Sequence, residues 1–317
     1  MIKNILIFLT SLLITLLCLE FTCRLVWNNQ EWWNQRAGTK QYIYPKNKYG
    51  FRDYEYTKNK PGNTVRIICF GDSFTFGGGI KFDDSYPKRL ERSLNVKYTP
   101  VTGKKYEVLN ISWPGYSSFQ EINKLDLIKE FKPDLLILGY CLNDTEDWSR
   151  KKEVIALRYK TILRKKPNDY LKGLFHKSYI ASFIANRLSN FKITLGYTKY
   201  YHRIYEYSYS GWKKTSESFR ILGRQEMPTL VAIFPLLSSP FEEYPFLDIH
   251  TQIITELKKN KLSYIDYYDF FKNEDNMRMQ VKPYRDPHPS EIATRIIEEH
   301  LFEKLTQEYK NILAGDS

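Results

Sequence analysis

Five short runs of apolar, branched and aromatic residues recur along the chain, and more polar stretches separate them. The runs are predicted strands, which cover residues 65–70, 106–111, 134–140, 229–234 and 262–267. The stretches between them are predicted helices, which cover residues 85–94, 119–131, 210–226 and 246–260, and a last helix follows residue 290. Strands that alternate with helices predict an α/β domain whose parallel sheet is covered on both faces. Ligands of such sheets bind at the carboxyl ends of the strands.

The first 27 residues carry the longest apolar run of the sequence. It extends almost without interruption from Ile5 to Leu19, and with its flanks it reaches the roughly 20 residues that span a bilayer. Glu20 and Arg24 lie four positions apart on one helical face, and the tryptophans that follow suit a headgroup layer. We therefore expect a transmembrane anchor over residues 1–27. A cleaved signal peptide is the alternative, and the lack of a small-x-small cleavage site after the run speaks against it.

The rest of the chain divides into a connector over residues 28–63 and one α/β domain over residues 64–317. Residues 146–209 separate the third and fourth strands, and they are predicted to form a helical insertion, because so long a segment is rarely a bare loop. The insertion leaves the sheet at the carboxyl end of the third strand, so it is in a position to cover a site there. An amphipathic cap without any role in ligand binding is the alternative.

Composition narrows the class of protein. Of the 317 residues, 42% are hydrophobic and 26% are charged, as in ordinary globular proteins, so a disordered chain is excluded. The net charge of +12 predicts attraction to anionic surfaces, which include nucleic acid, acidic polysaccharide and phospholipid headgroups. A membrane anchor argues against nucleic acid as the partner. The four cysteines have no metal-ligand spacing, and we expect neither a disulfide framework nor a bound metal.

The stretch RIICFGDSFTFGGG, residues 66–79, ends the first predicted strand abruptly at Gly-Asp-Ser. Ser73 is therefore expected at the carboxyl edge of the sheet and at the start of a helix, where backbone amides offer hydrogen bonds to a developing oxyanion. Glycines at position 71 and at positions 77–79 let backbone and substrate approach each other closely. An ordinary strand-to-helix turn with Ser73 as its N-cap is the alternative.

Three other segments place polar groups at the carboxyl ends of strands. Gly115, in NISWPGYSS, offers an amide that could face the same space, and Asn143, in GYCLND, offers a side-chain amide that could donate to an oxyanion. His288 and Asp286, in RDPHP, are a candidate general base and the acid that orients it. Each segment alone has a plainer interpretation as a turn, a helix cap or a loop. Together they form a coherent catalytic constellation.

In this order and spacing, the segments GDSFTFG, NISWPG, GYCLND and DPHP resemble the sequence blocks of the SGNH/GDSL hydrolase superfamily. The resemblance implies a flavodoxin-like three-layer α/β/α sandwich, with serine esterase or acyl-transfer chemistry and with no cofactor or metal. It also implies that Ser73, Gly115, Asn143 and His288 are the serine, glycine, asparagine and histidine of the family. GFRD, residues 50–53, resembles a segment that precedes the first block in membrane-anchored bacterial members.

The last block departs from the family's usual D-x-x-H pattern. Asp286 lies only two residues before His288, and Arg285 occupies the position expected for the acid. Shortened D-x-H-P forms are compatible with the family, so we expect Asp286 to be the third member of a catalytic triad. If its carboxylate does not reach the ring, a backbone carbonyl orients His288 and a dyad replaces the triad.

These residues predict nucleophilic acyl transfer. Ser73 attacks an ester carbonyl while His288 takes its proton, and water later releases the acyl group. The amides of Ser73 and Gly115 and the side chain of Asn143 form the oxyanion hole. We expect a membrane-anchored esterase that removes O-acetyl or another short acyl group from a carbohydrate or envelope substrate, such as an acidic glycan or a lipid. The alternatives are an O-acetyltransferase acting on a polysaccharide, and a non-catalytic binding or scaffolding protein.

The sequence also bears on where the domain is located. NIS at Asn110 and NDT at Asn143 fit the N-glycosylation pattern, and a glycan on the second would block the oxyanion hole. A domain exported by a prokaryotic cell avoids this conflict, so we expect a single-pass membrane protein with an extracytoplasmic catalytic domain. Arg24, Arg36 and Lys40 favour the opposite orientation, because positive charges next to a membrane helix tend to remain inside.

Overall fold

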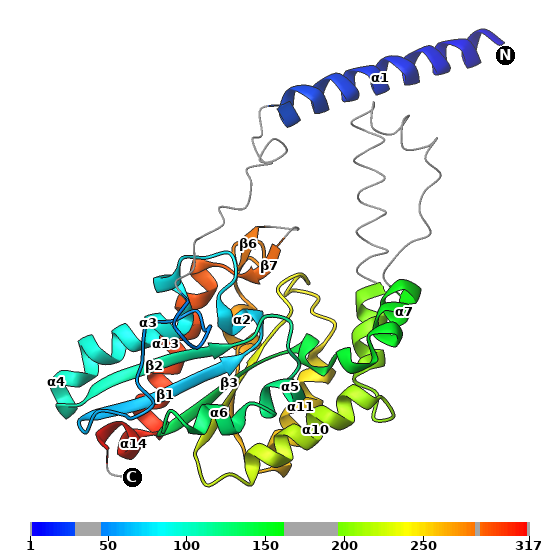
Figure 1. The fold of residues 1–317 in the computed structure, drawn as a ribbon. Helices are drawn as coiled ribbons and strands as arrows, with labels where there is room; N and C mark the ends of the chain where they lie inside the picture. The colour runs from blue at the N-terminus through cyan, green and yellow to red at the C-terminus, as the bar shows by residue number, and fades with distance from the viewer. Residues whose placement is uncertain (1, 29–45, 162–195, 283–285, 316–317) are drawn as a thin grey trace. The chain divides into compact units, whose positions relative to one another are not determined.

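The computed structural model describes residues 2–28, 46–161, 196–282 and 286–315 (Figure 1). The chain divides into two compact units, one made of residues 1–40 and 155–200 and the other of residues 41–154 and 201–317. Residues 29–45 of the predicted connector and residues 162–195 of the predicted insertion lie outside the described residues.

Helix α1 (Ile2–Asn28) and most of helix α7 (Lys151–Thr161) belong to the first unit. Among the described helices, α1 alone is long and apolar enough to cross a membrane, over residues Lys3–Thr22. Its apolar window is not buried within the described structure. A membrane anchor and a signal sequence share these properties, so the two interpretations of the apolar run both stand.

The second unit is built on a sheet of five parallel strands in the order β2-β1-β3-β4-β5 (Figure 1). The strands are β1 (Thr64–Gly71), β2 (Lys105–Ser112), β3 (Leu135–Cys141), β4 (Thr229–Phe234) and β5 (Ser263–Asp266). All five predicted strands are confirmed. Every residue of β1, β3 and β4 is buried, which is why these strands are continuous apolar runs rather than alternating ones.

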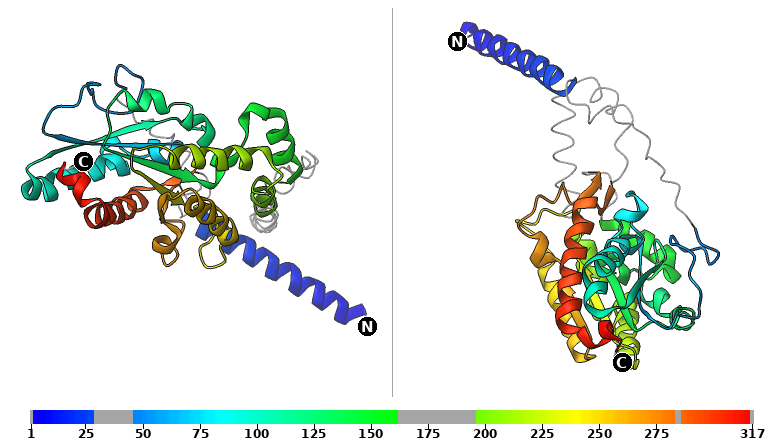
Figure 2. Two further views of the ribbon diagram at one scale, coloured as in Figure 1. Left: turned by 90° about the horizontal axis from the view of Figure 1, so that it is seen from below. Right: turned by 90° about the vertical axis from the view of Figure 1, so that its left-hand side faces the viewer.

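Helices cover both faces of the sheet, so the predicted three-layer α/β/α architecture is confirmed. Helices α3 and α13 pack together on one face, and α5 and α10 pack together on the other (Figures 1 and 2). The helices of this unit are α2 (Ser73–Phe76), α3 (Tyr86–Ser93), α4 (Thr99–Thr102), α5 (Ser118–Ile122), α6 (Leu125–Lys129), α10 (Ser210–Gly223), α11 (Leu247–Lys259), α12 (Tyr268–Phe271), α13 (Glu291–Glu308) and α14 (Lys310–Ala314).

Two details differ from the prediction. The single helix expected over residues 119–131 is divided into α5 and α6 by a break at Asn123 and Lys124. A second, two-stranded antiparallel sheet, β6 (Gln280–Lys282) with β7 (Asp286–Pro289), lies between α12 and α13 in the sequence and was not predicted. It matters for function because β7 carries both Asp286 and His288.

Two glycines allow α2 to lie directly against the sheet. Gly71 of β1 pairs with Gly139 of β3, and the side chain of Thr75 occupies the space that their missing side chains leave. A Cβ atom on Gly139 would lie 2.2 Å from Thr75 Oγ1, and one on Gly71 would lie 2.5 Å from the same atom. Any larger residue at either position would therefore push α2, and Ser73 at its start, away from the sheet.

We expect Gly139→Ala to lower the free energy of unfolding by about 1–3 kcal/mol, because the added methyl overpacks a closed part of the core. The control is Gly62→Ala, where a Cβ meets nothing within 4 Å and the change should stay within about 0.5 kcal/mol. Urea unfolding of the full chain in detergent measures both values. Equal stabilities of the two variants would contradict the tight contact between α2 and β3.

Candidate active site

Ser73 is the first residue of α2, and only Asp72 separates it from the end of β1. Asp72, which is fully buried, caps the helix: its Oδ1 accepts a hydrogen bond from the backbone N–H of Phe74 at 2.8 Å. Capping of this kind fixes the first turn of a helix. As predicted, Ser73 thus lies at the carboxyl edge of the sheet, and its side chain is half-buried.

Asp286, His288 and Ser73 form a continuous chain of hydrogen bonds. The Nε2 atom of His288 lies 2.9 Å from Ser73 Oγ, and its Nδ1 atom lies 2.5 Å from Asp286 Oδ1. The carboxylate therefore reaches the ring in spite of the two-residue spacing, and the alternative of a backbone carbonyl as the partner of the ring is not what the structure contains. Arg285, at the position usual for the acid, lies outside the described residues.

Asn143 and Gly115 lie on turns at the same edge of the sheet. Asn143 belongs to the short 3-10 helix Leu142–Thr145, which follows β3 directly. Gly115 is exposed in the turn after β2, with a φ of 79° that favours glycine. The backbone N–H of Trp113 donates to the carbonyl of Gly71 at 2.9 Å, which attaches this turn to the residue before Asp72. All four predicted segments thus meet at one sheet edge.

Asp72 has a second contact that the sequence did not reveal. Its Oδ2 accepts a hydrogen bond from Asn143 Nδ2 at 3.1 Å, and the Ser73 hydroxyl lies 3.3 Å from the same oxygen. Capping of α2 is therefore only half of what this side chain does, because it also joins the turn after β1 to the turn after β3. Asp144 caps the turn after β3: it accepts from the backbone N–H of Cys141 at 2.9 Å.

The surrounding charges act on the protonation of His288. Burial lowers the pKa of the imidazole, but the hydrogen bond and the charge of Asp286, together with the charge of Asp72, outweigh burial and raise the pKa above the ordinary 6.5. The hydrogen bond from His288 in turn lowers the pKa of Asp286. Asp286 is therefore ionised at neutral pH, and it favours the tautomer of His288 that carries its proton on Nδ1 and presents Nε2 to Ser73 as an acceptor.

Two further carboxyl groups interact with Asp72 from within the core. Glu121 and Asp144 are both fully buried. Burial, followed by the negative charge of Asp72, raises the pKa of each well above its ordinary value. The interior next to the site therefore holds acids that resist ionisation.

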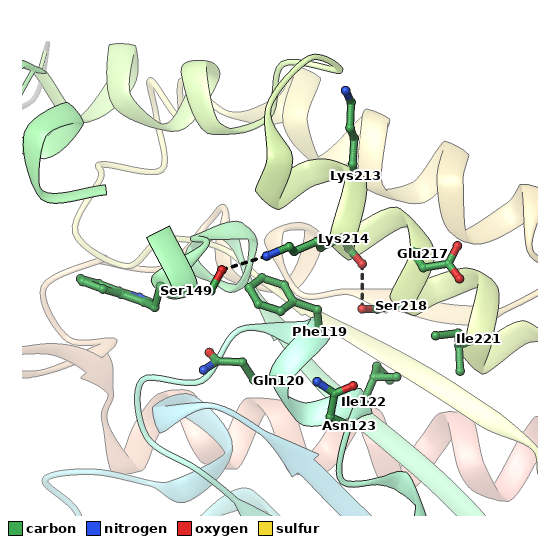
Figure 3. A pocket seen from close by; sticks show the side chains of 11 residues that line it. Phe119, Gln120, Ile122, Asn123, Ser149, Lys213, Lys214, Glu217, Ser218 and Ile221 are labelled. Carbon is green, nitrogen blue, oxygen red and sulfur yellow. Dashed lines mark hydrogen bonds between the residues drawn. The ribbon is translucent and has the colours of Figure 1, made fainter. Parts of the chain in front are cut away.

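A separate cavity of about 620 Å³ lies between α5 and α10 (Figure 3). Lys214 extends across it: its Nζ stands 4.8 Å from the centre of the Phe119 ring and donates to Ser149 Oγ at 2.9 Å. None of the predicted site residues lines this cavity. Among the described residues, no three His, Cys, Asp or Glu side chains are grouped so that they could hold a metal ion.

Comparison with known proteins identifies the family. The model of the GDSL-like Lipase/Acylhydrolase family matches residues 69–296, which is most of the chain and includes every residue of the site. The chain belongs to this family. It is accordingly an ester hydrolase of the SGNH/GDSL type, and the resemblance that its sequence blocks carry is confirmed. No curated protein matches the chain by sequence.

Solved structures of similar fold include an acetylxylan esterase and a lipolytic protein. A catalytic mutant of an acetylxylan esterase from Geobacillus stearothermophilus is 13% identical, with a TM-score of 0.48, and the alignment covers 80% of this chain and 98% of that one. A member of the lipolytic G-D-S-L family from Veillonella parvula is 11% identical, with a TM-score of 0.43, and the alignment covers 77% and 99% of the two chains.

We expect the pKa of His288 to lie above 6.5 and to fall in Asp286→Asn, because the neutral amide no longer favours the imidazolium. Histidine-selective NMR titration measures this pKa, and the resonance is assigned by its loss in His288→Gln. The control is Asp269→Asn, which removes an exposed carboxylate that pairs with Lys272 and should leave the His288 titration unchanged. An equal pKa in Asp286→Asn and the unmodified hydrolase would contradict the assignment of Asp286.

Proposed function

We propose that this hydrolase is a membrane-anchored serine esterase, in which Ser73 is the nucleophile, His288 the general base and Asp286 the acid that orients the base. The observation that carries the proposal is the chain of hydrogen bonds from Asp286 to His288 to Ser73, at 2.5 and 2.9 Å. A serine hydroxyl is a weak nucleophile until an adjacent base accepts its proton, and the base must in turn be oriented by a third group.

In the proposed reaction, Ser73 Oγ attacks the carbonyl carbon of an ester while its proton passes to Nε2 of His288. The imidazolium that forms is stabilised by Asp286, since the same hydrogen bond that raises the pKa of His288 favours its charged form. His288 then gives this proton to the leaving alkoxide. Water, activated by the same base, attacks the acyl-enzyme and releases the acid.

The negative oxygen of the tetrahedral intermediate needs hydrogen-bond donors, and we assign this role to the amides of Ser73 and Gly115 and to the side chain of Asn143. Asn143 Nδ2 has two hydrogens, and Asp72 accepts one of them. The second remains to donate to the oxyanion, in an orientation that the first contact fixes. Removal of one such donor typically costs about 3–4 kcal/mol of transition-state stabilisation.

The substrate that we propose is a short acyl ester, such as an O-acetyl group, on a carbohydrate or another envelope component. In support, the rings of Trp113 and Tyr116 stack on each other at 5.6 Å on either side of Gly115. Both rings are half-buried, so part of this aromatic surface is available beside the proposed oxyanion hole. The net charge of +12 suits an acidic glycan or lipid as the carrier of the ester.

We expect Ser73→Ala to abolish turnover of p-nitrophenyl acetate by the full chain in detergent, while circular dichroism and the unfolding midpoint stay close to those of the unmodified protein. The side chain of Ser73 is at the sheet edge rather than in the core, so its loss removes chemistry and little packing. The control is Ser208→Ala, an exposed serine whose hydroxyl contacts only Glu206 two residues away. Equal kcat/KM in the two variants would contradict the mechanism. No turnover by the unmodified protein would instead favour the scaffolding function.

A second assay, with acetylated polysaccharide as substrate, separates hydrolysis from transfer. Acetylated polysaccharide is incubated with the protein, with and without a second glycan that carries free hydroxyl groups. Release of acetate at the same rate in both incubations supports an esterase, and acetate that appears on the second glycan identifies an O-acetyltransferase. The two reactions share the acyl-enzyme and differ only in which acceptor reaches it.

We further propose that α1 anchors the protein in a prokaryotic membrane and that the hydrolase domain lies outside the cytoplasm. Protease added to intact spheroplasts should therefore digest the domain, and a cytoplasmic marker protein should survive in the same sample. Survival of the domain until the spheroplasts are lysed would show that it faces the cytoplasm. A domain that is recovered free of the membrane without its first residues would show that α1 is a cleaved signal sequence.

A further inference from the structure

A short segment ahead of the first strand is buried against the active site. Gly50 is exposed, but the next three residues, Phe51, Arg52 and Asp53, are 5%, 1% and 2% exposed. This segment precedes the family match, which begins at residue 69. A fully buried arginine is rare unless it is paired or hydrogen-bonded. The groups that bind Arg52 therefore identify which part of the structure it stabilises.

Arg52 binds the loop that follows the nucleophile helix. Its Nη1 donates to the carbonyls of Phe76 and Gly77 at 2.7 and 2.5 Å, and its Nη2 donates to the carbonyl of Ile80 at 2.7 Å. These carbonyls belong to the end of α2 and to the glycine loop, residues 77–80. A planar guanidinium with several fixed donors can hold three carbonyls at once, which a lysine cannot match in geometry.

The glycine loop in turn lies against the strand pair that carries the acid. Gly79 has a φ of 83°, and a Cβ added to it would lie 2.7 Å from Val281 Cγ1 and 3.4 Å from Asp286 Oδ2. The loop thus leaves room for little more than a hydrogen between Gly79 and Val281, lies close to the Asp286 carboxylate, and is bound by the Arg52 guanidinium. A shift of the loop would change the space available to the carboxylate that orients His288.

The residues on either side of Arg52 contact two other parts of the site. The ring of Phe51 packs edge-on against Trp113 at 5.7 Å, next to the turn that carries Gly115. Asp53 Oδ2 accepts from the backbone N–H of Asn110, in β2, at 2.6 Å. Three consecutive side chains therefore reach the nucleophile loop, the turn after β2 and β2 itself, which is more than the closing of a surface loop requires.

We propose that Arg52 is a positioning residue of this active site, which acts through the glycine loop to hold Asp286 and the Ser73 helix in their mutual geometry. The inference rests on the proposed serine-esterase function and extends it to a residue outside the four catalytic segments. On this inference, residues 51–53 contribute to catalysis and do not merely connect the N-terminal part of the chain to β1.

Arg66 provides a matched control for a purely structural role. It is 0% exposed, and its Nη1 also donates to three backbone carbonyls, those of Thr57, Lys58 and Phe131. It differs in that it also pairs with Glu107, at 2.6 Å. It differs in position as well, because it lies near the start of β1, at the end of the strand away from Ser73. Loss of either arginine leaves buried carbonyls without donors and should lower stability. Only loss of Arg52 should lower kcat.

The test compares Arg52→Met and Arg52→Lys with Arg66→Met and Arg66→Lys in the full chain, with p-nitrophenyl acetate as substrate, at a temperature at which circular dichroism shows every variant folded. We expect Arg52→Met to lower kcat by about ten- to a hundredfold, as for other small misplacements of catalytic groups, with KM within about twofold. Arg52→Lys should recover part of the loss. Both Arg66 variants should keep the kcat of the unmodified enzyme.

Two further measurements keep the inference separate from plain instability and from the proposed function. The losses from Arg52→Met and Asp286→Asn should be non-additive in the double variant, because both act on the same carboxylate. Independently of activity, the NMR titration should show that Arg52→Met moves the pKa of His288 towards its value in Asp286→Asn. If Ser73→Ala retained activity, the proposed function would fail, and this titration would still decide the role of Arg52.

The inference is overturned if Arg52→Met and Arg66→Met have the same kcat, if the losses from Arg52→Met and Asp286→Asn are additive, or if the His288 titration is unchanged. Should Arg52→Met fail to fold, Arg52→Lys and Gly79→Ala decide the matter. The added methyl in Gly79→Ala would lie only 2.7 Å from Val281 Cγ1, in the strand pair that carries Asp286, and should lower kcat while Arg52 is intact. Unchanged kcat and an unchanged titration in both of these variants would equally overturn it.

Discussion

The arrangement of the site depends on the buried carboxylate of Asp72. A carboxylate without access to water is costly unless donors surround it, and here the Phe74 amide and the Asn143 side chain supply them. Each donor comes from the nucleophile helix or from the turn after β3, so the carboxylate is satisfied only when both elements are in place. The need of one buried charge thus fixes the nucleophile and the proposed oxyanion donor relative to each other.

Much of the fold could be predicted because the interior strands of a parallel sheet are apolar throughout. The predicted runs at 65–70 and 229–234 differ from β1 and β4 by at most one residue at each end. The edge of the sheet at which the site lies follows from the same pattern, since parallel strands end on the same side. Ser73 and Asn143 could therefore be placed together from their positions directly after two strands.

The parts that could not be predicted depend on contacts between distant segments. The β6–β7 pair is short, and Gln280–Lys282 has no apolar pattern that would distinguish it from a loop. Once β7 is a strand, Asp286 and His288 point to the same face, because side chains two positions apart do so, and this explains why the shortened spacing still brings the acid to the ring. The resemblance drew attention to GFRD, but the role of Arg52 could not be predicted, since the carbonyls that it binds are recognisable only after the glycine loop has folded.

The slot that holds Thr75 has a consequence for how related chains can differ. Gly71, Gly139 and Thr75 share one small volume, in which a Cβ on either glycine would lie within 2.5 Å of the threonine hydroxyl. A larger residue at 139 requires a smaller residue at 75 in the same chain, whereas a Cβ at 71 would also lie 2.6 Å from the carbonyl oxygen of Gly139. During descent position 139 should therefore vary only together with position 75, and position 71 should stay glycine, although 71 and 139 belong to strands separated by more than sixty residues of sequence.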